Sequence, residues 1–321
     1  MMNDKTKTAP LDSNEKPENE DALVAEIKRL KHERNAIILA HVYQPDEIQT
    51  IADYSGDSFA LSQKAAQTDA DVIVFCGVRF MAETANILSP DKITLLPAAN
   101  ATCRMFDDTI VEQVKKAKAE HPNAKVVAYV NTPAAVKAMS DICCTSSNAS
   151  AVVASMPEDT EILFVPDANL GQYAMEQSGR HVLPWQGGCP IHGELTPADI
   201  EKAKQLHPGA PVLMHPECKK AVRDMADYVG STTGIIKYAE QSDKQEFIIA
   251  TECGVLYELK RRCPGKRFFM ASDRLVCQDM KYTHLEEVRQ ALLTLESRVI
   301  VPADIREKAV AALNKMLSIK G

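Results

Sequence analysis

The sequence predicts an α/β protein of three similar α/β/α domains, each with a parallel sheet, arranged about a pseudo-threefold axis. Short apolar runs alternate with segments of helical spacing, which is typical of parallel α/β units. The same order of polar residues also recurs three times, in steps of 86 or 88 residues. The repeated sets are the pairs His41/Tyr43, Tyr129/Asn131 and His215/Glu217, the acids Asp53, Asp141 and Asp227, the hydroxyls Ser58, Ser146 and Thr232, and the cysteines Cys103, Cys189 and Cys277.

Each repeat contains three apolar runs that are short enough to be strands buried on both faces of a sheet. The expected strands are Ala36–Val42, Val72–Val78 and Ile93–Pro97, then Val126–Val130, Ile162–Pro166 and His181–Trp185, then Pro211–His215, Phe247–Thr251 and Arg267–Ala271.

Helical spacing of apolar residues separates these strands, as in Phe59–Gln67, Ala134–Met139 and Lys219–Tyr228, and Leu285–Leu317 is expected to form closing helices. The predicted organisation is a disordered tail at 1–21, α/β repeats at 22–106, 107–193 and 194–282, and closing C-terminal helices at 283–321.

Composition and charge exclude several classes of function. The chain has 321 residues, 45% hydrophobic and 25% charged, and a formal net charge of −7 without a basic block, so nucleic acid and anionic membranes are not expected partners. The sequence shows neither an apolar run of membrane-spanning length nor a secretion signal. We therefore expect a cytoplasmic protein whose nine cysteines stay reduced.

The polar pairs are expected to meet in one cavity, because ligands of parallel α/β sheets bind beyond the carboxyl ends of the strands. Residues two apart on an extended strand face the same side, so both members of a pair can point inward. The hydroxyl clusters that follow, around Ser58, Ser146 and Thr232, precede helical segments and could bind carboxylate or phosphate groups. The alternative is that these hydroxyls only cap helices.

Cys103, Cys189 and Cys277 each follow the last strand of a repeat, which favours metal ligation over simple burial. Two sites are compatible with three thiolates. One is a closed tetrahedral zinc completed by His192, and the other is a [4Fe–4S] cluster with one iron open to substrate. The many polar strand-end residues favour the open cluster. The other six cysteines have no matched partners and are assigned to packing.

At this point the chain resembles a known family, quinolinate synthase, over about residues 22–300 without a gap. The motifs that carry this resemblance are Ala40-His-Val-Tyr-Gln-Pro45, Asp53-Tyr-Ser-Gly-Asp-Ser58, Tyr129-Val-Asn131, Cys143-Cys-Thr-Ser146, Gly187-Gly-Cys-Pro-Ile-His192, His215-Pro-Glu217 and Gly230-Ser-Thr-Thr-Gly234. In some members additional cysteines surround the third ligand, whereas Cys277 stands alone here, which puts redox switching at that site in doubt.

The resemblance implies a transferase that condenses iminoaspartate with dihydroxyacetone phosphate to quinolinate, phosphate and water in NAD biosynthesis. It implies a [4Fe–4S] cluster on Cys103, Cys189 and Cys277. It also suggests functional coupling to an oxidase or dehydrogenase that produces iminoaspartate. The substrate contacts implied by the resemblance are His41, Tyr43, Ser58, Tyr129, Asn131, Ser146, His192, His215, Glu217, Thr232 and Thr233.

Among these residues, Glu217 with His215 beside it is the expected general base, and His41, Tyr43 and Tyr129 are the other catalytic candidates. Asn131, Ser146, Thr232 and Thr233 are expected to bind substrate carboxylates or phosphate. Competing functions are a small-anion-binding protein with structural zinc, a redox sensor, and another iron–sulfur hydro-lyase. The absence of a C-x-x-C motif disfavours a hydro-lyase of the aconitase type, and the absence of C-x-x-x-C-x-x-C disfavours a radical enzyme that uses adenosylmethionine.

Overall fold

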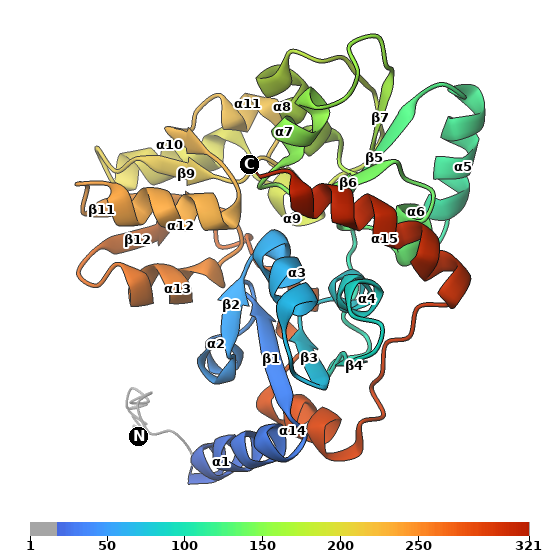
Figure 1. Ribbon diagram of the computed structural model, residues 1–321. Coiled ribbons are helices and arrows are strands. Elements are labelled where there is room, and N and C mark those ends of the chain that lie inside the picture. The colour runs from blue at the N-terminus through green and yellow to red at the C-terminus, as the bar shows by residue number, and fades with distance from the viewer. Residues whose placement is uncertain (1–17, 321) are drawn as a thin grey trace, which may run out of the picture.

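The computed structural model describes residues 18–320, which form three α/β units around a common centre (Figure 1). Each unit contains one four-stranded parallel sheet. The strand order is equivalent in all three, namely β2-β1-β3-β4, β6-β5-β7-β8 and β10-β9-β11-β12. The predicted fold class is therefore confirmed.

The first unit carries the N-terminal helix along the outer side of its sheet (Figure 1). Its elements are α1 (Glu18–Glu33), β1 (Ala36–His41), α2 (Asp46–Ile51), β2 (Tyr54–Gly56), α3 (Ser58–Gln67), β3 (Val72–Cys76), α4 (Arg79–Leu88) and β4 (Ile93–Leu95).

The second unit repeats this order after a connecting helix. Its elements are α5 (Ile110–Glu120), β5 (Lys125–Tyr129), α6 (Ala134–Lys137), β6 (Ile142–Cys144), α7 (Ala149–Ala154), β7 (Ile162–Val165), α8 (Ala168–Ser178), β8 (Val182–Leu183) and α9 (Pro190–Gly193).

The third unit follows the same plan and ends in a 3₁₀ turn after its last cysteine. Its elements are α10 (Pro197–Leu206), β9 (Val212–Met214), α11 (Lys220–Arg223), β10 (Tyr228–Val229), α12 (Thr232–Gln241), β11 (Glu246–Ala250), α13 (Val255–Arg262), β12 (Arg267–Met270) and η1 (Gln278–Lys281).

The central strands are buried on both faces, as their continuous apolar sequences predict. All five residues of β3 are buried. In β1, Ile38 and Ala40 belong to the core shared with α1 and α14 (Leu285–Thr294), whereas Leu39 belongs to the main core. No polar side chain can be accommodated within such strands without a partner, so polar groups appear where the strands end.

The prediction of three strands per repeat was wrong, because each sheet has a fourth, short strand. The additional strands β2, β6 and β10 have three, three and two residues and pair only with the first strand of their unit. An edge strand this short carries no measurable alternation of polar and apolar residues. Tertiary pairing, rather than local sequence, produces it.

Two helix predictions also need correction. Lys219–Tyr228 is not one helix, since α11 covers only Lys220–Arg223 and Tyr228 begins β10. Leu285–Leu317 is two helices, α14 and α15 (Ala303–Ser318), because Leu295 adopts a left-handed conformation that ends α14. Helix α14 packs against α1, whereas α15 packs against α6, β6 and α4 and so joins the second unit to the first (Figure 1).

The predicted N-terminal tail lies mostly outside the described residues, although α1 already begins at Glu18. The expectation of no membrane span is consistent with the helices between residues 18 and 320, none of which has both the length and the apolar content to cross a bilayer.

The repeated acids have the same structural task in all three units. Asp53, Asp141 and Asp227 accept a hydrogen bond from the backbone N–H of Ile38, Val126 and Val212, at 2.8, 2.9 and 2.8 Å. Each carboxylate thus accepts a hydrogen bond from a backbone N–H group near the beginning of the first strand, so this N–H group is not left without a partner. This equivalence confirms the repeat register that the sequence predicts.

Replacing Asp227 with Ala should leave the Val212 N–H without its acceptor. An unsatisfied buried donor costs about 1–3 kcal/mol, so the melting temperature should decrease by several degrees. Asp227→Asn is the matched control, because its amide oxygen can still accept the single N–H. Thermal unfolding followed by circular dichroism checks this, and equal losses in both variants would contradict it.

Candidate functional site

The three repeated cysteines lie in equivalent loops beyond the last strand of each unit. In each loop the residue two positions before the cysteine accepts a backbone hydrogen bond from the segment after the neighbouring strand. The bonds run from Arg79 to Ala101, from Ala168 to Gly187 and from Cys253 to Leu275, at 3.0, 3.0 and 2.9 Å. The cysteines are therefore structurally equivalent, as their spacing predicts.

One cavity at the centre of the molecule gathers these cysteines with nearly all the predicted polar residues. Its volume is about 110 Å³, which is room for several water molecules or a small ligand. The predicted site residues that line it are His41, Tyr43, Ser58, Cys103, Tyr129, Asn131, Ser146, Cys189, His192, His215, Glu217, Thr232 and Cys277. Thr233 is the exception, since it borders a separate depression beside Tyr54 and Arg261.

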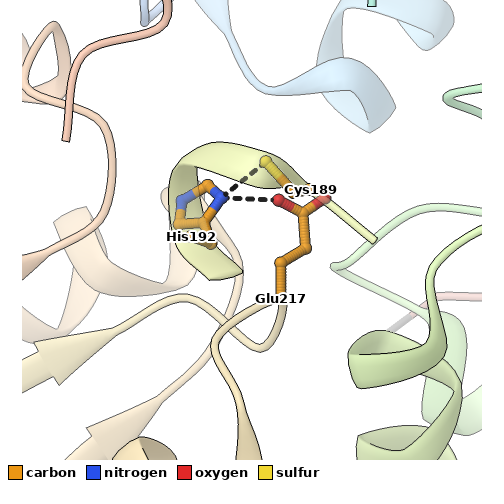
Figure 2. A group of neighbouring side chains, drawn as sticks. All are labelled: Cys189, His192 and Glu217. Carbon is orange, nitrogen blue, oxygen red and sulfur yellow. Dashed lines mark hydrogen bonds and ion pairs between the residues drawn. The ribbon is translucent and has the colours of Figure 1, made fainter. Parts of the chain in front are cut away.

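The histidine of the second cysteine loop connects two parts of the cavity. Cys189 is the N-cap of α9, and His192 lies within this short helix. The His192 Nδ1 lies 3.3 Å from the Cys189 Sγ and 2.7 Å from the Glu217 carboxylate (Figure 2). The ligand atoms of Cys189, His192 and Glu217 lie within 4.8 Å of one another, close enough to hold a metal ion.

On its other side His192 begins a chain of hydrogen bonds. The His192 Nε2 lies 2.9 Å from the Thr251 hydroxyl. The Thr251 hydroxyl lies 2.7 Å from the Tyr43 hydroxyl. The Tyr43 hydroxyl also lies 2.9 Å from the Thr232 hydroxyl. Thr251 was not predicted as a site residue from the sequence. Its position one residue after β11 is the only sequence signal that could have indicated it, since polar strand ends face the cavity.

Glu217 is a buried carboxylate in contact with two histidines of the site. Burial by itself would raise its pKa, but His215 and His192 nearby, together with hydrogen bonds to His192 and Tyr129, lower the pKa to about 2. The carboxylate is therefore ionised at neutral pH and can accept a proton. A carboxylate and an imidazole 2.7 Å apart also form a direct route for proton exchange.

Burial holds two histidines and two tyrosines of the cavity neutral. Burial lowers the pKa of His41 to about 4 and that of His215 to about 3, so both imidazoles are uncharged at neutral pH. Burial also raises the pKa of Tyr43 and Tyr129 well above its usual value, so both phenols keep their protons. These residues can donate and accept hydrogen bonds without adding charge.

Two of the predicted hydroxyls, Ser58 and Thr232, are not helix caps. Asp57 caps α3 by accepting a hydrogen bond from the Ala60 N–H, and Ser231 caps α12 by accepting one from Gly234. Ser58 and Thr232 are the next residues and face the cavity. The capping alternative therefore does not account for these two hydroxyls, which are available to a ligand near a helix N-terminus.

The three cysteines are chemically suited to a metal group with three thiolate ligands. Burial raises the pKa of Cys103 and Cys189, and raises that of Cys277 to about 11, so without a cation these thiols are protonated at neutral pH. A bound cation stabilises thiolates and reverses this preference. All three cysteines line the same cavity, so one bound group can reach them.

The molecule is thus an α/β protein of parallel sheets whose strand ends enclose thiols, imidazoles and a carboxylate in one cavity. The family model described as quinolinate synthetase A protein matches residues 25–318, and the chain belongs to this family. The quinolinate synthase of Methanoregula boonei is 54% identical over 92% of this chain and 98% of its own length. Those of Clostridium kluyveri and Geobacter metallireducens are each 51% identical, over 93% of this chain and 98% of their own lengths.

The buried neutral histidines predict a loss of stability in acid. The unfolded chain takes up protons on histidine near pH 6.5, whereas His41 stays neutral in the folded protein down to about pH 4. The free energy of unfolding should therefore decrease as the pH falls through this range, by about 1.4 kcal/mol per pH unit for each such histidine. Urea unfolding at pH 7, 6 and 5 measures this decrease in the free energy of unfolding.

The control for this experiment is His181→Gln, which removes an exposed histidine and should keep the wild-type pH dependence. His41→Gln should reduce the slope of the unfolding free energy against pH by an amount that corresponds to the uptake of up to one proton. An unchanged slope in His41→Gln would show that another group causes the acid sensitivity.

Proposed function

We propose that this chain condenses iminoaspartate with dihydroxyacetone phosphate to form quinolinate, phosphate and water, in the synthesis of NAD. The observation that carries the proposal is the single cavity in which one cysteine from each unit meets the polar strand ends of all three units. Membership of the quinolinate synthase family supports the same reaction. All nine cysteines are free thiols, which fits the cytoplasmic location that we propose.

We further propose that Cys103, Cys189 and Cys277 hold a [4Fe–4S] cluster. A single zinc ion keeps its sulfur ligands about 3.8 Å apart, since each Zn–S bond is about 2.3 Å. Among residues 18–320 only Cys189, His192 and Glu217 form such a close group, and the three cysteine sulfurs do not. A cluster places each cysteine on a different iron and so tolerates wider spacing. When bound, its fourth iron supplies a Lewis acid for the departing hydroxyl.

The residues of the chain would bind and orient the two substrates. Ser146, Asn131 and Thr232 can donate hydrogen bonds to substrate carboxylates or phosphate, and the N-terminus of α12 adds its dipole to this binding. Thr233 remains a candidate at the same helix start, although its side chain borders the separate depression. Neutral donors of this kind bind anions without a basic surface, which agrees with the acidic chain.

Proton transfer would involve Glu217 and the hydrogen-bonded chain that reaches Tyr43. Glu217 is the ionised acceptor, and His192 lies between it and Thr251. Tyr43 keeps its proton and can donate it, through its bond to Thr251, or orient the triose portion. His41, His215 and Tyr129 surround the same space as neutral hydrogen-bonding groups.

The alternative function is a zinc-containing protein that binds small anions. The close group of Cys189, His192 and Glu217 favours it, because one cysteine, one histidine and one carboxylate form a regular zinc ligand set. The two functions differ in metal content, colour and the requirement for Cys103 and Cys277.

The cluster proposal predicts that protein purified without oxygen has a broad absorbance near ~400 nm. Cys103→Ala, Cys189→Ala and Cys277→Ala should each lose it, because each removes one thiolate ligand. Cys263→Ala, a buried cysteine outside the cavity, should retain it. A colourless wild type that holds zinc would exclude the cluster and favour the anion-binding alternative.

Glu217→Gln should retain the ~400 nm absorbance but lower kcat for quinolinate formation by roughly 100- to 10,000-fold, because the amide cannot accept a proton. The matched control is Glu258→Gln, a buried carboxylate that pairs with Arg261 outside the cavity, and its kcat should stay close to wild type. Wild-type turnover by Glu217→Gln would remove Glu217 from the acid–base chemistry.

A further inference from the structure

Two fully buried carboxylates, Asp167 and Glu252, lie behind the cysteine loops of the second and third units. Asp167 is two residues beyond the end of β7, and Glu252 is two residues beyond the end of β11, so they occupy equivalent places. Asp167 does not line the cavity, and neither residue was identified from the sequence. Burying a carboxylate is costly unless hydrogen bonds compensate for lost water, so each should have dedicated donors.

Each carboxylate uses one oxygen for the cysteine and the other for its own segment. Asp167 accepts the Cys189 N–H on Oδ2 at 2.8 Å and the Leu170 N–H on Oδ1 at 2.7 Å. Glu252 accepts the Cys277 N–H on Oε1 at 3.0 Å and the Gly254 N–H on Oε2 at 2.7 Å. Lys281 pairs with Glu252, with its Nζ 3.0 Å from Oε1.

The first unit has no carboxylate at the equivalent position, and its cysteine loop is held by another residue. The residue equivalent to Asp167 and Glu252 is Val78, as the matched bond from Arg79 to Ala101 shows. The Cys103 loop is bound instead by Asp279, which is two residues after Cys277. Its carboxylate accepts the Thr102 N–H at 3.1 Å and the Arg104 Nε–H at 2.8 Å. Every cysteine loop is thus tied to a buried carboxylate.

We infer that Asp167 and Glu252 are positioning residues that fix the backbone of Cys189 and Cys277 so that both sulfurs point to a common metal group. This inference rests on the proposed function, because it assigns these acids to the proposed cluster. Each carboxyl group joins the cysteine loop to a rigid strand end, so the loop cannot shift without breaking a buried hydrogen bond. Partners of this kind generally change metal affinity about 10- to 100-fold when removed.

The two-oxygen arrangement makes the carboxyl-to-amide change a sharp probe. An amide has one acceptor oxygen, and its NH₂ group would face the second N–H as donor against donor. Asp167→Asn therefore breaks one bond at almost constant volume, and Glu252→Gln breaks at least one, because Lys281 also contacts both Glu252 oxygens. The matched control is Asp227→Asn, because Asp227 accepts a single backbone N–H, from Val212, at a strand start.

The experiment loads wild type and the three variants with iron and sulfide under anaerobic conditions. It follows the ~400 nm absorbance after an iron chelator is added and records the melting temperature of each variant. Asp167→Asn and Glu252→Gln should lose the cluster about 10- to 100-fold faster than wild type, and Asp227→Asn at the wild-type rate. Glu252→Gln should also raise the midpoint potential of the cluster, because it removes a negative charge beside Cys277, whereas Asp227→Asn should leave it unchanged.

Wild-type rates of cluster loss in Asp167→Asn and Glu252→Gln would overturn the inference, as would an equal acceleration in Asp227→Asn, which would indicate general destabilisation. If Asp167→Asn does not fold, Glu252→Gln decides the question through its rate and potential. A wild type that takes up no cluster is a different result, since it overturns the proposed function itself.

Discussion

The site depends on one constraint, which is that parallel strands buried on both faces can carry polar groups only at their ends. Each of the three sheets ends its strands toward the centre of the molecule (Figure 1). Side chains such as His41, Tyr129 and His215 lie at the end of the first strand or directly after it, and the cysteine loops follow the last strand. Thirteen of the fourteen residues predicted for the site therefore line one cavity.

Burial also sets the electrostatic character of this cavity. Desolvation keeps His41 and His215 neutral and the three thiols protonated, whereas Glu217 stays ionised and accepts hydrogen bonds from His192 and Tyr129. A cation would convert the thiols to thiolates without any change in the fold. The anionic substrates that we propose would meet neutral hydroxyls and helix N-termini rather than a basic surface, which is compatible with a net charge of −7.

The three units share a backbone frame but not a chemistry. The frame is kept by repeated bonds, such as those of Asp53, Asp141 and Asp227 to the first strands. The side chains that face the centre differ from unit to unit, and the carboxylates behind Cys189 and Cys277 have no counterpart in the first unit, where Val78 takes their place. A symmetric frame can therefore present an asymmetric set of groups to two different substrates.

The sequence by itself determined the fold class and the register of the repeat, including the equivalence of the three cysteines, because short apolar runs and a fixed spacing are visible in the chain without its tertiary structure. It did not determine the edge strands β2, β6 and β10, whose two or three residues form only by pairing with a neighbour. Nor did it reveal Thr251, Asp167 and Glu252, or separate Thr232 from Thr233. Only tertiary structure decided these, because they depend on which groups from distant segments lie within hydrogen-bonding distance.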